Sequence, residues 1–255
     1  MPPENSKRIA PFFVRRIQRA IRSRKVAREF SGLSNKEVFE KIYEEKRWGS
    51  SDQEHRKYSS GVGTRDIEVV QKYIDAVKGF ISQKSDIASG LDLGCGDFSV
   101  GSQICDSFDE FTAADVAANV IEENKKEFGD KDARFLCLNL AEDNIPAVDV
   151  IFVRQVLQHL SNAEIKKFVR NIEGKYKYLI VTESVSKSLF FVPNRDITTG
   201  PGIRIHKRSG VVLEKPPFNI KHSKVDILLE YLRGKELFVT KVYHARIHSS
   251  SGCCT

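Results

Sequence analysis

Short apolar segments alternate with segments of helical periodicity through the middle of this chain, and this alternation limits the possible folds more than any other feature. The apolar segments between residues 88 and 184 read ASGLDLG, FTAADV, ARFLCLNL, VDVIFV and KYLIVTES. Helical patterns separate several of them, at 99–108, 119–129 and 162–174. This alternation is typical of a parallel sheet with both faces covered. Residues 226–247 add two strands around an RGKE turn. We therefore predict an α/β fold.

The first of these strands runs into a glycine-rich turn, LDLGCGDFSVG, at residues 91–101. A dinucleotide fingerprint needs a third glycine at the place where this chain has Ser99. Asp92, two residues before Gly94, would repel a phosphate and attract a cation, and no Gly-Lys-Ser/Thr phosphate loop is present. S-adenosylmethionine (SAM) carries a sulfonium and an ammonium and no phosphate. The turn therefore favours SAM over NAD or a nucleotide.

Polar residues also end the next two strands. Asp115 lies 19 residues after Gly96, where a carboxylate accepts hydrogen bonds from both hydroxyls of a ribose in NAD and SAM sites alike. After the following strand, the Asn139 side chain can accept from an adenine amine, and the N–H of Leu140 can reach a ring nitrogen. These positions predict a site for the nucleoside of the cofactor.

Four motifs together, LDLGCG, ADV, CLNLAEDNIPAVDVIFV and QVLQHLS, resemble the class I SAM-dependent methyltransferase family over about residues 60–190. GCGDF, IYEE..WG upstream and N.DI.TG with PPF downstream are similar to a bacterial-type subgroup that modifies glycans or small metabolites. The resemblance implies a seven-stranded, mostly parallel, Rossmann-like sheet with an antiparallel last strand. It implies SAM contacts from Asp92, Gly94, Cys95, Gly96, Phe98, Asp115, Val116, Asn139, Leu140, Arg154 and Gln155.

Two of these positions depart from the family. Phe98 replaces a glycine, and we expect it to shape the methionine end of the pocket. Asn139 replaces a common aspartate, which should weaken adenine recognition without abolishing it.

The acceptor side of the site is expected near His159, in RQVLQHL just past the fourth strand. Methyl transfer to an alcohol needs a proton acceptor, and His159 is the candidate; a histidine that packs a helix is the alternative. The segment is similar to that of ubiquinone-pathway O-methyltransferases, whose carboxylates are associated with a divalent metal. Here Gln155 and Gln158 stand in those places, and amides make a poor site for a hard cation. We therefore expect no metal.

Acceptor specificity is expected in the long interruption after the fifth strand, since long insertions in compact domains tend to form lids or binding loops. Asp196 or Glu183 could be the base if His159 is not. Trp48 could close over the site or stack on the substrate, and a tryptophan that packs in the core is the alternative. The polar residues that we expect to bind substrate with Trp48 are Asn194, Arg204 and His206, and solvated loop positions are the alternative for each.

Charge is concentrated at the N-terminus. Residues 1–30 hold nine of the 41 Lys and Arg and two of the 34 Asp and Glu, which leaves 32 of each sign elsewhere. Residues 7–28 form a basic amphipathic pattern. Three interpretations of this pattern remain open: an anchor at a membrane surface, a helix docked on the domain, and a targeting segment. The neutral remainder makes nucleic acid an improbable partner. The cysteines form no spaced framework, which indicates a reducing compartment.

We predict a cytoplasmic enzyme, free or peripheral at an anionic membrane, that O-methylates a small metabolite or a sugar hydroxyl. A nucleic-acid or protein methyltransferase that docks through the basic arm is an alternative, and so is a non-catalytic protein with this fold; an NAD-dependent oxidoreductase is the weakest. The expected divisions are a basic helix (1–33), helical cap elements (34–82), the methyltransferase domain (83–248) with a substrate insertion (184–219), and a disordered tail (249–255).

Overall fold

The computed structural model describes residues 24–246 apart from 27, 51–56, 62, 64, 65 and 235. Most of the basic pattern at 7–28 and the whole of the tail at 249–255 lie outside the described residues. Across the part of the chain that is described, no helix has the length and apolar character needed to cross a bilayer.

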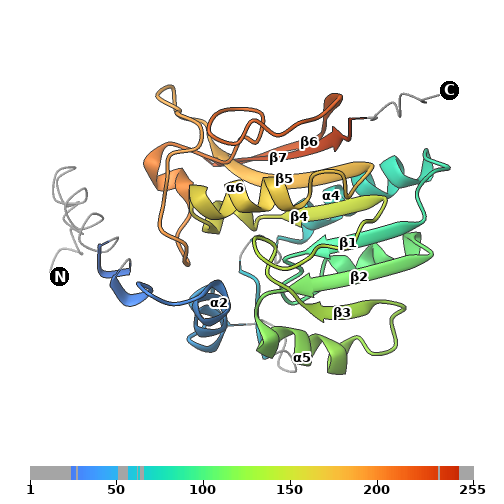
Figure 1. Ribbon diagram of the computed structural model, residues 1–255, viewed down its shortest axis with the longest axis horizontal. Helices are drawn as coiled ribbons and strands as arrows, with labels where there is room; N and C mark the ends of the chain where they lie inside the picture. Colours follow the sequence, from blue (N-terminus) through green and yellow to red (C-terminus); the bar gives the residue numbers. More distant parts are fainter. Residues whose placement is uncertain are drawn as a thin grey trace, which may run out of the picture.

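Seven strands form one sheet in the order β3-β2-β1-β4-β5-β7-β6 (Figure 1). Strands β1 to β5 are mutually parallel where they pair, and β7 is antiparallel to both β5 and β6. This arrangement confirms the predicted seven-stranded sheet. The strands are β1 Ser89–Leu93, β2 Glu110–Asp115, β3 Arg134–Cys137, β4 Val150–Arg154, β5 Tyr178–Ser186, β6 Lys224–Arg233 and β7 Glu236–His244.

Four helices of ten or more residues are described: α2 Asn35–Glu44, α4 Ile67–Ser82, α5 Ala118–Glu127 and α6 Asn162–Asn171. Ser34 and Glu37 form a capping box at the start of α2, and Asp66 and Ser161 cap α4 and α6. These side chains satisfy backbone N–H groups that have no partner inside the helix. These three helices therefore begin where the sequence provides an oxygen acceptor, whereas α5 begins after Ala117 without a side-chain cap.

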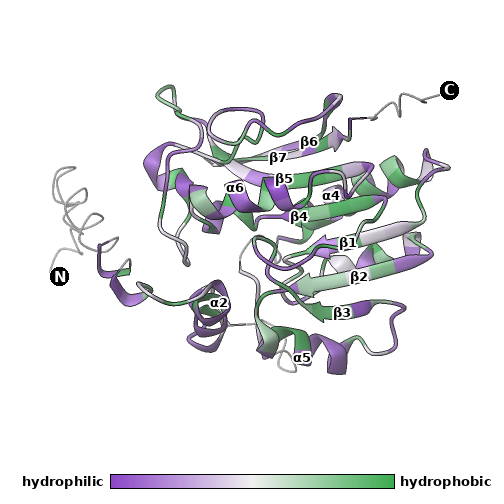
Figure 2. Cartoon of the chain, in the orientation of Figure 1, coloured by the Kyte–Doolittle hydropathy of each residue, from purple (hydrophilic) through white to green (hydrophobic). Residues whose placement is uncertain are grey.

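The alternation of side chains along the strands creates two apolar layers. Leu91 and Val153 face one layer, where Phe168 of α6 packs. Phe152 faces the other, with Tyr73 of α4. In Figure 1, α6 lies in front of the sheet and α4 behind it, and Figure 2 shows hydrophobic residues gathered along the central strands. Although α4 falls within the predicted cap elements, it covers the second face of the sheet.

The predicted helix at 99–108 is the main departure in secondary structure. The chain forms two single turns of 3-10 helix there, η1 Gly101–Gln103 and η2 Cys105–Ser107. The Ser102 hydroxyl and the Gln103 amide donate to the Ser99 carbonyl, and such local bonds compete with an α-helix. Gly101 lowers helix propensity further. The apolar residues of this segment are still buried in the core. Their spacing therefore resembles that of a helix although the chain forms successive tight turns.

Candidate active site

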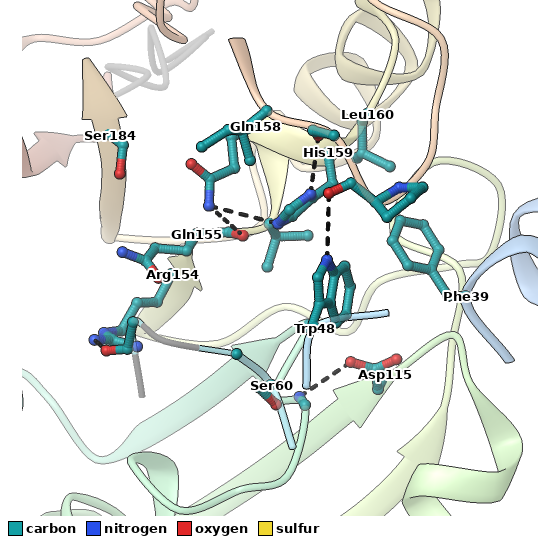
Figure 3. Close-up of a pocket in the computed structure, with 18 of the residues that line it drawn as sticks. Phe39, Trp48, Ser60, Asp115, Arg154, Gln155, Gln158, His159, Leu160 and Ser184 are labelled. Atoms are coloured by element: carbon teal, nitrogen blue, oxygen red, sulfur yellow. Dashed lines mark hydrogen bonds between the residues drawn. The ribbon is translucent and has the colours of Figure 1, made fainter. Parts of the chain in front are cut away.

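A cavity of about 1340 Å³ opens at the carboxyl ends of the parallel strands. Parallel strands bring the residues that follow them to one edge of a sheet, which is the usual ligand edge of this kind of fold. Figure 3 shows side chains from several distant segments turned toward this space. The predicted residues that line it are Trp48, Asp92, Gly94, Cys95, Gly96, Asp115, Val116, Asn139, Leu140, Arg154, Gln155, His159 and His206.

The glycine-rich turn after β1 has a backbone that other residues would strain. Gly94 and Gly96 have φ angles of +88° and +55°, in the left-handed region that favours glycine. A Cβ on Gly94 would lie 2.4 Å from Val156 Cγ2, and one on Gly96 would lie 2.1 Å from Ser60 Oγ. At Gly94 and Gly96 the turn therefore has no side chains between its backbone and the cavity.

Asp115, the last residue of β2, is tied to this turn. Its Oδ2 accepts a hydrogen bond from Gly96 N at 3.0 Å, and its Oδ1 accepts one from Ala117 N at 2.9 Å. The side chain is only 7% exposed, and this burial raises the pKa of its carboxyl while the two N–H groups oppose the rise. Each carboxylate oxygen has a further lone pair, so the group can accept from a diol in the cavity.

Asp92 on β1 is a second buried carboxyl that borders the cavity. Burial raises its pKa to about 7, against the opposing attraction of the Arg154 guanidinium, and the Asp115 and Asp97 carboxylates raise it further. Tyr73 of α4 faces the same region, with its ring 5.2 Å from the Arg154 guanidinium. A cation bound beside Asp92 would favour its charged form.

A covering segment, residues 57–61 with Gly63, lies over the glycine-rich turn. Ser60 N donates to Asp97 Oδ2 at 2.8 Å, and Asp97 N donates to Ser60 Oγ at 2.8 Å. Arg154 donates to the Gly63 carbonyl at 2.8 Å. Sequence reasoning placed this stretch in an undistinguished loop; its SSGVG composition was the signal that backbone approaches another element closely there.

His159 lies in a single 3-10 turn, η3 Leu157–His159, at the opposite wall. Its Nδ1 is 3.1 Å from the Gly202 carbonyl and its Nε2 is 3.5 Å from Gln158 Nε2. The Trp48 ring lies 4.8 Å from the imidazole, and its indole N–H donates to the Pro201 carbonyl (Figure 3). Burial lowers the pKa of His159 to about 4. The imidazole is therefore neutral near pH 7.

Two polar atoms on the cavity wall lack a protein partner. Within the described residues, Gln158 Oε1 and Arg154 Nε are buried and make no hydrogen bond, and both residues line the cavity. Buried polar atoms without partners are rare. Because both atoms are closed to solvent, the two side chains would have to turn for a ligand in the cavity to reach them.

Asn139 occupies the expected place after β3, but its amide oxygen already accepts from Ala141 N at 3.0 Å. The Asn139 N–H donates to Asp143 Oδ2 at 2.7 Å. The side chain thus stabilises its own turn, and an adenine would share that oxygen's second lone pair.

Phe98 does not line the cavity, so its predicted contact with the cofactor is corrected. The side chain is fully buried, and its ring lies 5.0 to 6.2 Å from those of Phe111, Phe128 and Phe135. Its φ of 53° is left-handed, which explains why a glycine would suit this place. The aromatic packing holds that conformation.

Glu183 also lies outside the cavity. Successive side chains of a strand point to opposite faces, so its neighbour Ser184 lines the cavity while Glu183 points into the protein. Glu183 Oε1 accepts from Leu157 N at 2.8 Å, and burial raises the pKa of the carboxyl to about 8. Its predicted role as an alternative base is corrected to support of the turn that carries His159.

The insertion after β5 contributes to the cavity, but through other residues than most of those predicted. Its wall is formed by Ile197, Thr198, Pro201, Gly202, Ile203, Ile205, His206 and Lys207. Asp196 accepts from Asn162 N at 2.7 Å at the start of α6. Asn194 is buried and bonds both backbone groups of Val212. The predicted catalytic role of Asp196 and the substrate role of Asn194 are therefore corrected to structural ones.

Arg204 has a structural role as well, against the prediction that it binds substrate. Its side chain is 0% exposed. The guanidinium donates to the carbonyls of Arg195, Leu157 and Leu160 at 3.2, 2.8 and 2.6 Å, and to Asn162 Oδ1 at 3.0 Å. It joins the insertion to the turn that carries His159.

Replacing Arg204 with methionine is expected to reduce the free energy of unfolding by about 3 kcal/mol, because several buried acceptors lose their charged donor. Arg195→Met is the matched control: its side chain is exposed, so its effect should stay within about 0.5 kcal/mol. Urea unfolding measures both. A stable Arg204→Met protein that no longer bound its substrate would restore the predicted role.

A family model described as a methyltransferase domain matches residues 91–176. The fold is similar to the crystal structure of magnesium protoporphyrin IX methyltransferase from Synechocystis PCC 6803 with bound SAH, at 14% identity and a TM-score of 0.53, covering 83% of this chain and 100% of that chain. It is also similar to a SAM-dependent methyltransferase from Leishmania major, at 16% identity and a TM-score of 0.50, covering 69% and 73%. Identities this low support the fold alone. No curated protein matches this chain by sequence.

The sheet order is that of the class I SAM-dependent methyltransferase fold, and residues 91–176, which include the glycine-rich turn and Asp115, match a methyltransferase domain. The predicted fold and the predicted cofactor, S-adenosylmethionine, are confirmed. The residues present fit this cofactor: a bare backbone turn borders the cavity between two buried carboxyls that suit a cation and a diol. Individual contacts to it remain predictions.

The pKa of Asp92 gives the cofactor affinity a pH dependence. Bound SAM brings positive charge, which favours the carboxylate, so affinity should rise by up to about tenfold per unit as pH rises toward 7 and level off above it. Titration calorimetry in two buffers of different ionisation enthalpy should detect proton release below pH 7. Asp92→Asn should flatten the dependence; an unchanged slope in that variant would assign it to another group.

Proposed function

We propose that this methyltransferase transfers the methyl group to a hydroxyl of a small metabolite or a sugar. The observation that carries the proposal is that His159 lies on the cavity wall with a neutral imidazole. An alcohol must lose its proton as the new bond forms, so an oxygen acceptor requires a base close to the site of transfer.

The hydrogen bonds of His159 suit that task. With Nδ1 protonated, the imidazole donates to the Gly202 carbonyl, and the lone pair of Nε2 accepts a long hydrogen bond from Gln158 Nε2 at 3.5 Å, which the acceptor hydroxyl is proposed to replace. The pKa of about 4 keeps this nitrogen unprotonated near pH 7. Of the three predicted bases, His159 lines the cavity, whereas Asp196 and Glu183 do not, so His159 is the candidate that an acceptor in the cavity could reach.

When bound, SAM would supply an electrophilic methyl group, whose bond to sulfur breaks as the bond to the acceptor oxygen forms, and would leave as S-adenosylhomocysteine; the chain is proposed to align the acceptor for this step. Asp115 and Asp92 are proposed to hold the ribose and the positively charged end of the cofactor. Trp48 and the insertion screen the space near His159 from water. His159 Nε2 is proposed to accept the proton of the acceptor hydroxyl.

The size of the cavity supports a small-molecule acceptor bound beside the cofactor. Its volume of about 1340 Å³ exceeds the 300–1,000 Å³ typical of small-molecule sites, which leaves room for two ligands. Gln158 lines the cavity, and a rotation of its side chain would turn Oε1, which only accepts, toward a substrate hydroxyl. His206, at the exposed mouth, is a further candidate contact.

The test is a transfer assay with methyl-labelled SAM against matched panels of hydroxylated metabolites, glycans and the corresponding amines. We expect the label in an alkali-stable ether of one hydroxylated compound. Label in an amine would overturn the oxygen specificity, and label in RNA or protein would instead favour docking through the basic arm. Binding of S-adenosylhomocysteine is measured beside it, so that a wrong acceptor class is distinguished from a failed cofactor site.

A further inference from the structure

The first turn of the insertion presents large apolar side chains to solvent. Leu189 is 100% exposed, Phe190 71% and Val192 41%. The connection that follows β5 projects away from the sheet (Figure 1), and hydrophobic colour marks part of it in Figure 2. Several neighbouring exposed apolar residues are uncommon on a soluble surface and mark an interaction site.

Hydrogen bonds hold this turn in shape. Phe191 N donates to the Ser188 carbonyl at 3.0 Å, and Phe190 N donates to Ser188 Oγ at 3.2 Å. Leu189 and Phe190 are thus the two central residues of a closed turn, where glycine, proline and small polar residues usually stand. The turn is built to carry apolar side chains at its tip.

Its base is anchored as well. Val192 N donates to the Arg208 carbonyl at 3.1 Å, and Asn194 N donates to the Gly210 carbonyl at 2.9 Å. Asn194 is buried and bonds the 212–216 backbone through its side chain. These hydrogen bonds at the base hold the turn in place, so its position does not depend on packing of the apolar side chains at the tip.

Basic residues surround the apolar tip. Lys187, Lys207 and Arg208 are exposed, and the Arg208 guanidinium lies 5.5 Å from the centre of the Phe190 ring. Residues 187–223 contain seven Lys and Arg and two Asp and Glu, a formal charge of +5. An apolar tip surrounded by basic side chains suits the surface of an anionic membrane. The apolar side chains can enter the boundary of the acyl chains, and the basic side chains can bind the phosphates of the headgroups.

We propose that the docking tip, residues 187–192, inserts into the surface of an anionic membrane, with Lys187 and Arg208 at the headgroups. The residues of this surface differ from those of the basic pattern at 7–28, and its assignment does not rest on the methyl acceptor. The same insertion lines the cavity at 197–207, so docking would bring the cavity mouth close to the membrane.

The experiment is co-sedimentation of the full chain with phosphatidylcholine vesicles, with and without phosphatidylglycerol. We expect binding to the anionic vesicles that weakens with salt, and a loss of at least about tenfold in partitioning for Leu189→Asp combined with Phe190→Asp. Ile67→Asp is the matched control, because Ile67 is 83% exposed but stands alone on α4. It should bind as the unaltered chain does.

Two further variants distinguish insertion of the tip from attraction of the basic arm to the membrane. The first is the full chain with Arg15→Glu, Arg16→Glu and Arg19→Glu combined, which removes basic charge from the arm. The second is Phe190→Trp, whose tryptophan emission should shift to the blue with anionic vesicles if the tip enters the bilayer. Unchanged vesicle binding in the Leu189/Phe190 variant would overturn the proposal. So would self-association that this variant abolishes in the absence of lipid, because the tip would then be a contact between copies of the chain.

Discussion

Asp115→Ala is expected to weaken the binding of S-adenosylhomocysteine by about 100-fold or more, because hydrogen bonds to a charged group contribute about 1.5–3 kcal/mol each and a ribose offers two donors. The substitution also removes the acceptor that holds Gly96 N and Ala117 N. Titration calorimetry of the purified protein measures the effect, and NAD serves as the control ligand.

The matched control is Asp196→Ala, since Asp196 is an exposed aspartate outside the cavity that accepts from backbone N–H groups in the same way. Its affinity should stay within about twofold of the unaltered chain. Thermal unfolding must show that both variants fold. If folded Asp115→Ala bound S-adenosylhomocysteine as tightly as the unaltered chain, the placement of the ribose at Asp115 would be wrong.

Burial of the Asp92 carboxyl also affects the stability of the fold. The folded pKa of Asp92, about 7, lies above its ordinary value of 3.8, so the folded protein retains this proton to higher pH than the unfolded chain. Its contribution to stability is therefore favourable at low pH and is lost as pH rises toward 7. A carboxylate held ready for a cation destabilises the ligand-free fold, and such trade-offs are expected at functional sites.

The fold could be predicted from the sequence because its signals are local. Strand periodicity and the glycine-rich turn determine the parallel sheet and its ligand edge, and residues that end strands, such as Asp115, fall at that edge without further information. Asp92, Gly94 and Gly96 line the cavity for the same reason. The failed helix at 99–108 shows the limit, since spacing alone does not distinguish a helix from successive tight turns.

The insertion could not be predicted residue by residue, because the direction of a side chain in a loop depends on contacts far away in sequence. Arg204 and Asn194 look like ligand-binding residues when only their chemistry is known. Their partners, the carbonyls of Leu157 and Leu160 and the backbone of 212–216, become visible only in three dimensions. Glu183 was misplaced by one position, since its neighbour Ser184 faces the cavity.

His159→Ala is expected to lower the rate of methyl transfer by about 10²–10⁴-fold, the range for loss of a general base, once the assay has identified an acceptor. Binding of S-adenosylhomocysteine should stay within about twofold, because the proposed contacts of the cofactor lie with Asp92, Asp115 and the glycine-rich turn. This split between kcat and cofactor affinity is the measurement.

The pH profile separates a base from a packing residue. With a pKa of about 4, His159 is already deprotonated across the neutral range, so kcat at saturating SAM should fall only as pH drops toward 4, where the base gains its proton. His159→Gln keeps a polar side chain beside Trp48 and serves as the control for packing: if it restored the rate, His159 would be structural. If the rate instead stayed low and the acidic fall vanished, the proton acceptor would be the imidazole.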